Sequence, residues 1–245
     1  MSSIGLAVLI LALDTSSRAG SLAIVRNGEV VAERSGDPSR THAERLPLAF
    51  ADVCRTAGIQ LRDVDLFAVA AGPGSFTGLR VGIAAIQGLA FALDRRVVAV
   101  SSLEAVAAAA PGAALIGAWV DAQRGEVFAQ LFTVPVPCTQ PSAIRHPLTT
   151  PISAAPDIVL ARWQADAALD TVAFHGDGAV RYTQRIRTAA GPAAHVAATA
   201  VPLAGVIGRI AATQPERAVV PHAIAPVYVR KPDAELARDR RQGSI

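Results

Sequence analysis

The sequence predicts an α/β protein that consists of two related lobes, each with a mixed β-sheet. Three observations favour this fold class: the order of strand and helix patterns in the first half, a faint repetition of that order in the second half, and the composition. Of the 245 residues, 51% are apolar, 18% are charged and 4% are aromatic. Such a chain can bury one large core or two smaller ones, and little of it resembles a disordered sequence.

The first half begins with three predicted strands, at residues 8–13, 21–25 and 29–33. The first is a continuous apolar run, typical of a buried strand, and Asn27-Gly28 is a strong hairpin signal between the other two. Helices are then predicted at residues 41–57, 77–93 and 103–110, alternating with strands at 66–70 and 97–100. Three consecutive strands followed by alternating helices and strands describe an RNase H-like lobe, the repeating unit of the actin, sugar-kinase and Hsp70 (ASKHA) superfamily.

The two longest helices carry distinct signals. Thr41 and Glu44 form a capping box at the start of the first, although Pro47 predicts a bent first turn or a later start. The second helix contains Gly82 and Gly88, each of which costs about 1 kcal/mol relative to Ala. Its apolar residues lie on more than one face, so it needs cover on several sides. Either the protein's own sheet or a second chain could supply that cover.

The second half repeats the first. Residues 10–14 (Ile-Leu-Ala-Leu-Asp) are echoed by residues 116–121 (Ile-Gly-Ala-Trp-Val-Asp). The spacing from Asp14 to Gly72 is 58 residues, and that from Asp121 to Gly176 is 55 residues. We therefore predict two copies of one fold: an RNase H-like lobe at 1–110 with the partner-binding helices, and a degenerate lobe with a tail at 111–245. The alternative is two unrelated α/β pieces.

The charge and cysteine content restrict the class of protein. The net charge is +3, Lys231 is the only lysine, and no basic run is long enough to predict a nucleic-acid patch. We interpret the cluster at 238–241 as a solvated tail. Cys54 and Cys138 form no CxxC pair, which fits a reducing compartment. The apolar run at 4–13 is too short to span a bilayer, so we expect a cytoplasmic protein with no membrane association.

Asp14, Thr15 and Ser16 close the first strand, where kinases and ATPases with this fold hold phosphate and a metal-bound water. A phosphate cradle needs a glycine-bearing turn so that backbone N–H groups can approach the anion, and no glycine appears before Gly20. The alternative, in which Asp14 bonds the backbone of its own turn, is favoured. We therefore interpret the segment as a degenerate phosphate loop.

A Gly-rich turn precedes the second long helix; its key residues are Gly72, Gly74, Ser75, Thr77 and Gly78. A turn between a strand and a helix N-terminus can bind phosphate. This one lacks the lysine of a Walker motif and does not match GxGxxG, so the nucleotide signal is weak. A structural role explains it equally well, because the glycines allow positive φ and Thr77 can cap the helix.

No other residues form a catalytic set. The sequence lacks a GxSxG nucleophile elbow, and neither cysteine has a histidine nearby in sequence. The five histidines have no metal-ligand spacing: His42, His146, His175, His195 and His222. We predict no catalytic residue and no metal site.

Five segments occur in the order seen in one known family: residues 10–16, 72–82, 100–105, 121–128 and 226–230. On these segments the chain resembles the TsaB (YeaZ) family, strongly over residues 8–130 and thinly over 135–220. The resemblance implies a two-lobed actin-like protein without catalysis of its own. It also implies a subunit of the machinery that puts threonylcarbamoyl on adenosine in tRNA.

The resemblance implies a set of partners. The chain would pair with its paralogue TsaD, the transferase subunit, and the ATPase TsaE would join them; alone it would form a homodimer. Contact with tRNA would be indirect or weak. The isolated chain would have no cofactor, but ATP or ADP could lie at the junction with the partner.

Ser102 and Val106 stand where TsaD-like sequences have two metal-ligating histidines. This difference separates the chain from the catalytic paralogue and disfavours an M22-type metallopeptidase. An active ATPase or kinase of the same fold is the other alternative.

We expect the partner surface on the two long helices, where Gly82 and Ala85 would allow close approach. The resemblance implies a four-helix bundle formed by these helices and their counterparts in TsaD. The predicted interface residues are Leu46, Phe50, Val53, Leu79, Gly82, Ala85 and Leu89.

Overall fold

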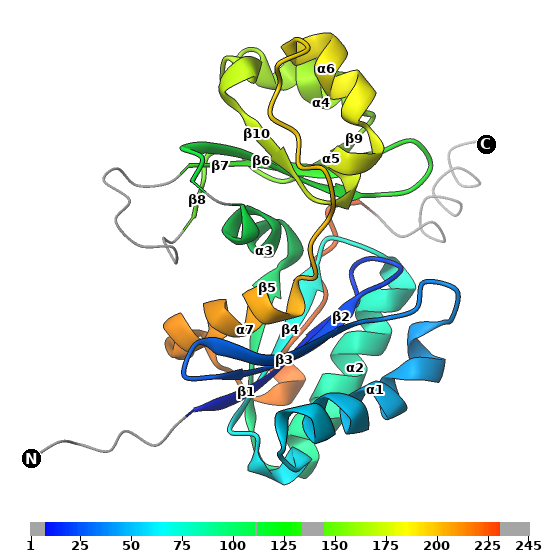
Figure 1. Ribbon diagram of the computed structural model, residues 1–245, viewed down its shortest axis with the longest axis vertical. Coiled ribbons are helices and arrows are strands. Elements are labelled where there is room, and N and C mark those ends of the chain that lie inside the picture. The colour runs from blue at the N-terminus through cyan, green and yellow to red at the C-terminus, as the bar shows by residue number, and fades with distance from the viewer. Residues whose placement is uncertain (1–7, 111, 134–144, 231–245) are drawn as a thin grey trace, which may run out of the picture.

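The computed structural model describes residues 8–110, 112–133 and 145–230. Cys138, Lys231 and the Arg-containing segment at 238–241 lie outside these residues. The chain forms two lobes, each built on one β-sheet, stacked along the long axis of the molecule (Figure 1). Among the described residues, no helix is long and apolar enough to cross a membrane.

The first sheet has five strands in the order β3-β2-β1-β4-β5. β1 pairs antiparallel with β2 and parallel with β4; β2 and β3 are antiparallel, and β4 and β5 are parallel. This is the RNase H-like order that the sequence predicts. The strands are β1 (Leu9–Asp14), β2 (Ser21–Arg26), β3 (Glu29–Ser35), β4 (Leu66–Gly72) and β5 (Arg96–Ser101).

Both faces of this sheet are covered, which explains why β1 is apolar at every position. Leu9, Leu11 and Leu13 face a core formed with α1 (His42–Ala57) and α2 (Phe76–Ala92). Ile10 and Ala12 face the opposite core, which includes α3 (Ser102–Ala109), α7 (Ala204–Thr213) and part of the second lobe. A short 3₁₀ helix, η1 (Leu61–Asp63), follows α1.

The second sheet has the order β10-β6-β7-β8, with β9 also pairing with β7. β6 is antiparallel to β7 and parallel to β10, as β1 is to β2 and β4. The structure thus confirms the predicted repeat. The elements are β6 (Leu115–Asp121), β7 (Val127–Thr133), β8 (His146–Pro147), β9 (Ile152–Ala154), α4 (Pro156–Trp163), η2 (Leu169–Thr171), β10 (Ala173–His175), α5 (Asp177–Arg181) and α6 (Thr183–Ala190).

After the second lobe the chain returns to the first (Figure 1). α7 packs on β1 and β2, and η3 (Pro215–Arg217) and η4 (Pro221–Ala223) follow it. Val219 forms a β-bridge with Val97, and the Val227 N–H donates to the Ala71 carbonyl at 2.7 Å. The division at residue 110 therefore stays a prediction, but α7, which lies in the range assigned to the second lobe, contacts the first sheet.

The helix starts differ from the sequence analysis at one point. The capping box of Thr41 and Glu44 is formed, and α1 begins at His42 despite Pro47. In α2 the predicted cap at Thr77 is wrong: Ser75 is the cap, and its hydroxyl accepts from the Gly78 N–H at 3.2 Å. Ser and Thr are both good N-cap residues, and α2 begins after the earlier of the two, Ser75.

Candidate functional site

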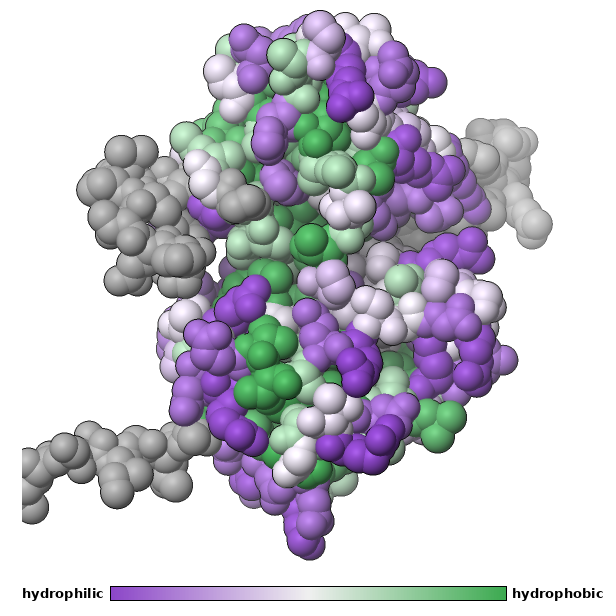
Figure 2. Space-filling view, viewed as in Figure 1, coloured by the Kyte–Doolittle hydropathy of each residue, from purple (hydrophilic) through white to green (hydrophobic). Residues whose placement is uncertain are grey.

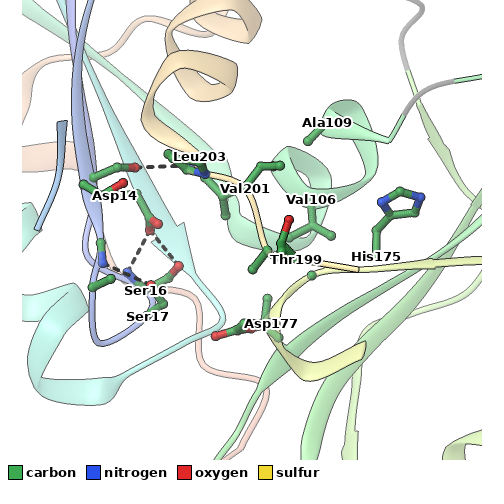
Figure 3. A pocket seen from close by; sticks show the side chains of 18 of the residues that line it. Asp14, Ser16, Ser17, Val106, Ala109, His175, Asp177, Thr199, Val201 and Leu203 are labelled. Carbon is green, nitrogen blue, oxygen red and sulfur yellow. Dashed lines mark hydrogen bonds between the residues drawn. The ribbon is translucent and has the colours of Figure 1, made fainter. Parts of the chain in front are cut away.

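A cleft with a volume of about 380 Å³ lies between the lobes (Figure 3). The loop after β1 forms one wall, the start of α5 forms another, and residues 197–203 cross between them. Hydrophobic side chains gather between the lobes on the face shown in Figure 2, whereas its two ends are mainly hydrophilic. The polar lining residues are Asp14, Ser16, Ser17, Ser21, Ser35, His175, Asp177 and Thr199.

Asp14 lies at the carboxyl end of β1 and is 3% exposed. Its Oδ1 accepts two hydrogen bonds from Ser16, one from the backbone N–H at 2.8 Å and one from the hydroxyl at 2.6 Å. Asp14 therefore bonds its own turn, as the favoured structural interpretation requires. Burial raises the pKa of the Asp14 carboxyl, and the Ser16 hydrogen bonds offset part of that rise.

The Gly-rich turn packs directly on the loop after β1. The Ser75 N–H donates to the Ser16 carbonyl at 2.7 Å. A Cβ at Gly74 would lie 2.6 Å from the Ser16 carbonyl oxygen, and a Cβ at Gly78 would lie 2.3 Å from the Thr15 carbonyl oxygen. The two glycines thus allow close packing within the chain. The backbone groups of this turn contact protein where a phosphate cradle would contact an anion.

Asp177 faces Asp14 across the cleft (Figure 3). Its Oδ1 accepts from the Asp121 N–H at 3.0 Å. Burial raises the pKa of Asp177, and the charge of Asp177 adds to the rise in the pKa of Asp14. No Lys or Arg is among the described lining residues, so the ionisable groups that face the cleft are mainly the carboxylates of Asp14 and Asp177.

Asp177 and His175 line the cleft but were not predicted from the sequence as site residues. The sequence repeat could have indicated them. It aligns Gly176 with Gly72, and this alignment places the start of α5 beside the carboxyl end of β6. His175 is half-buried, and burial together with nearby His195 lowers its pKa. Its Nε2 is buried without a hydrogen-bond partner among the described residues.

The other candidate residues have structural roles. His42 holds the loop after β1, since its Nε2 lies 3.0 Å from the Ser17 carbonyl and its Nδ1 lies 2.6 Å from Arg45. Ser102 and Val106, at the positions of the histidines in TsaD-like sequences, are both buried in α3. Within the described ranges, no three His, Cys, Asp or Glu side chains come together as a metal site.

α1 and α2 lie side by side on one face of the first sheet, as expected (Figure 1). Within the predicted interface, Phe50, Ala85 and Leu89 are partly exposed. The remaining four residues are buried within the chain, so their predicted place on the partner surface is wrong: Leu46, Val53, Leu79 and Gly82. The helical period of α2 turns residues 79, 82, 83 and 86 toward the sheet and the loop after β1.

Gly82 is one of the predicted interface residues that pack within the chain instead. A Cβ at this position would lie 2.1 Å from Thr15 Oγ1, within the same chain. The exposed glycine of α2 is Gly88, where a Cβ would meet nothing within 4 Å. We call the exposed residues Ala84, Gly88 and Phe91 (81% exposed) of α2, together with the exposed Leu48 of α1 (64% exposed), the outer helix face.

Three of the segments that carry the family resemblance meet in space. Tyr228 packs on Phe76 with ring centroids 5.2 Å apart, and its hydroxyl accepts from Arg80 Nε at 2.9 Å. Two residues further on, Arg230 donates to Glu126 at 2.8 Å in the turn after β6. The C-terminal segment thus joins the Gly-rich turn of one lobe to the hairpin of the other.

The fold and the cleft define a class: a two-lobed protein with an ASKHA-like fold, whose loop after β1 packs against its own Gly-rich turn. A family model described as TsaD, tRNA N6-adenosine threonylcarbamoyltransferase, matches residues 30–134. YeaZ from Pseudomonas aeruginosa has a similar structure, with a TM-score of 0.72 and 31% identity over 90% of this chain and 99% of that one. The chain belongs to the TsaB (YeaZ) family and is a paralogue of TsaD.

Curated relatives agree with this assignment. The tRNA threonylcarbamoyladenosine biosynthesis protein TsaB of Escherichia coli is 39% identical over 122 residues, 49% of this chain and 52% of that protein. TsaB of Bacillus subtilis is 36% identical over 124 residues, 50% of this chain and 54% of that protein. The chain matches about half the length of these relatives.

Proposed function

We propose that this chain is a non-catalytic subunit of the complex that forms threonylcarbamoyladenosine in tRNA. In this role it pairs with and supports a TsaD-like transferase subunit, and the pair recruits a TsaE-like ATPase. Membership of the TsaB family carries the proposal, since the TsaB relatives are named for this pathway. The loop after β1 supports a role without phosphate chemistry, because Asp14 bonds Ser16 of its own turn and no glycine occurs between Asp14 and Gly20.

The outer helix face is the proposed pairing surface. Phe91 and Leu48 expose large apolar side chains there, and exposed apolar patches commonly mark interaction sites. Ala84 and Gly88 have small side chains on the same face of α2, which allows a partner helix to approach closely. The same face would form the homodimer of the isolated chain, and the TsaD-like partner would compete with it.

Nucleotide and RNA enter this proposal only through the assembly. The isolated chain carries no cofactor, and ATP or ADP is expected only at the junction with the partner. Contact with tRNA is indirect or weak. The ATPase alternative predicts that the purified chain hydrolyses ATP and that Asp14→Ala abolishes turnover. We expect negligible hydrolysis by the chain alone.

The pairing surface is tested with Gly88→Arg. Gly88 is exposed and surrounded by open space, so the variant should fold normally while placing a bulky charge in the helix seam. We expect at least a 100-fold weaker affinity for the TsaD-like subunit in calorimetry, with an unchanged circular dichroism spectrum. Ala161→Arg is the matched control, because Ala161 is an exposed helical residue of the other lobe. Wild-type affinity of Gly88→Arg would place the interface elsewhere.

A further inference from the structure

His42, the first residue of α1, contacts the loop after β1 and Arg45 through its two ring nitrogens. Its Nδ1 lies 2.6 Å from Arg45 Nη2, and its Nε2 lies 3.0 Å from the Ser17 carbonyl oxygen. A guanidinium can only donate, so Nδ1 is the acceptor and carries no proton. A carbonyl oxygen can only accept, so Nε2 carries the proton and donates to Ser17. The two partners therefore fix one neutral tautomer of His42.

The charged form of His42 does not fit these contacts. Protonation would place an N–H on Nδ1 that faces the N–H of Arg45, and would bring two positive charges together. Arg45 has little room to move away, because it is buried and packs on Gly36, where even a Cβ would overlap Nη1. Its Nη2 also donates to the Arg18 carbonyl at 2.9 Å. Protonation of His42 therefore breaks its contact with Arg45.

The surroundings of the ring do not offset this repulsion. The ring faces the loop at Gly20 and α2 at Gly78, where a Cβ would lie 3.0 Å from its Cε1 and 3.2 Å from its Cδ2. Among the described residues, Arg45 is the charged group that acts on the ring. Three further charged groups act on the guanidinium instead: Arg40, Asp37 and Asp14. Burial and the charge of Arg45 lower the pKa of His42, and the Ser17 hydrogen bond opposes this decrease.

The same contacts position one wall of the interlobe cleft. His42 and Arg45 bond the carbonyls of Ser17 and Arg18, which lie in the loop after β1. Ser17 and Gly20 of this loop line the cleft (Figure 3). The loop therefore keeps its place against α1 only while the imidazole is neutral.

We propose that His42 is an acid-sensitive switch: the neutral imidazole fastens the loop after β1 to α1, and protonation releases the loop and loosens this wall of the cleft. The folded state disfavours the proton, so its stability is highest above about pH 6.5, the ordinary pKa of histidine. Stability falls as the pH drops below that value, and the loop is released as the pH reaches the lowered pKa of His42. The switch does not depend on the proposed pairing.

The test is NMR on the purified full chain, labelled with ¹⁵N, between pH 8 and pH 5. At pH 8 the ring shifts of His42 should show a bare Nδ1 and a protonated Nε2. As the pH falls, the ring should titrate below pH 6.5, and the amides of residues 17–20 should shift with the same midpoint. Their protection from exchange should fall by at least about 10-fold at pH 5, whereas β4 should keep its protection.

His42→Gln is the variant that does not titrate. Its neutral amide offers one acceptor and one donor to the same two partners, so protection of residues 17–20 should be equal at pH 8 and pH 5. His222→Gln is the matched control, because His222 is exposed and outside this cluster, and it should behave as the wild type.

Four outcomes would overturn the proposal. A proton on Nδ1 at pH 8 would contradict the tautomer, and ring titration at or above pH 6.5 would contradict the repulsion. An equal loss of protection in β4 would indicate global unfolding rather than release of the loop. An equal loss in His42→Gln would assign the change to another group. If His42→Gln does not fold, different midpoints for the ring and the loop amides of the wild type would refute the switch.

Discussion

The close contact between Gly82 and Thr15 supports a sharp prediction about Gly82→Ala. A Cβ at Gly82 would lie 2.1 Å from Thr15 Oγ1, 3.0 Å from Cγ2 and 3.1 Å from Cβ. Thr15 is fully buried, so its side chain has little room to move away. Overpacking of this kind costs about 1–3 kcal/mol, and a gain of about 1 kcal/mol in helix propensity offsets part of it.

We therefore expect Gly82→Ala to lower the free energy of unfolding by up to about 2 kcal/mol, measured by urea unfolding at a single protein concentration. Thr15→Ala removes both crowding groups together with a hydroxyl that has no hydrogen-bond partner among the described residues. In the Thr15→Ala background, Gly82→Ala should become neutral or stabilising by about 1 kcal/mol. Gly88→Ala, on the same helix and with no neighbour within 4 Å, should stabilise by about 1 kcal/mol in either background.

Equal destabilisation by Gly82→Ala in the wild-type and Thr15→Ala backgrounds would refute the expected clash between the new Cβ and Thr15. The loss would then arise from the helix rather than from the loop after β1. A destabilising effect of Gly88→Ala would point the same way, since it would mean that α2 tolerates no side chain on its exposed side.

Three further predictions concern single sites. Burial raises the pKa of Asp14 above its unfolded value near 3.9, so ionisation of Asp14 lowers the stability of the folded chain at higher pH. Asp14→Asn should therefore raise the thermal midpoint at pH 7, and this gain should vanish near pH 3. An equal gain at both pH values would contradict this. Ser75→Ala should cost about 1 kcal/mol by removing the α2 cap, whereas Thr77→Ala should be nearly neutral; the reverse order in urea unfolding would restore Thr77 as the cap. Glu104→Gln should cost up to about 1 kcal/mol by weakening its 2.8 Å ion pair with Arg217, with a smaller difference in 1 M NaCl, and a salt-independent loss would exclude a Coulombic origin.

The order of elements along the first lobe could be predicted because its signals are local. The Asn27-Gly28 hairpin joins β2 to β3, and the apolar runs of β1 and β4 identify strands buried on both faces. The repeat in the second lobe followed from the echo of residues 10–14 at 116–121 and from the similar spacing to the next glycine turn. The return of α7 to the first sheet could not be predicted, because no local pattern states which of two lobes a C-terminal helix covers.

The interface prediction was wrong mainly in the orientation of α2, because it placed Leu79 and Gly82 on the outer side of the helix. Gly82 and Gly88 occur in similar surroundings of small and apolar residues, so the sequence gives both the same weight. What separates them is the loop after β1, which contacts Gly82 and leaves Gly88 free. The loop is distant in sequence, so periodicity within the helix cannot reveal the contact.

The two sides of α2 have different roles, one within the chain and one in the proposed assembly. On the inner side, Gly78 and Gly82 let the helix pack on Thr15, and the Ser75 N–H donates to Ser16. These groups, which lie where a phosphate-binding turn would meet an anion, therefore set the position of α2 on the sheet. On the outer side, Gly88 belongs to the proposed pairing surface. Substitutions in the loop after β1 should then shift α2 and weaken pairing without touching the partner, as the Gly82→Ala and Thr15→Ala variants can test by calorimetry with the TsaD-like subunit. If Gly82→Ala lowers stability but leaves partner affinity at the wild-type value, the two sides of α2 are not coupled.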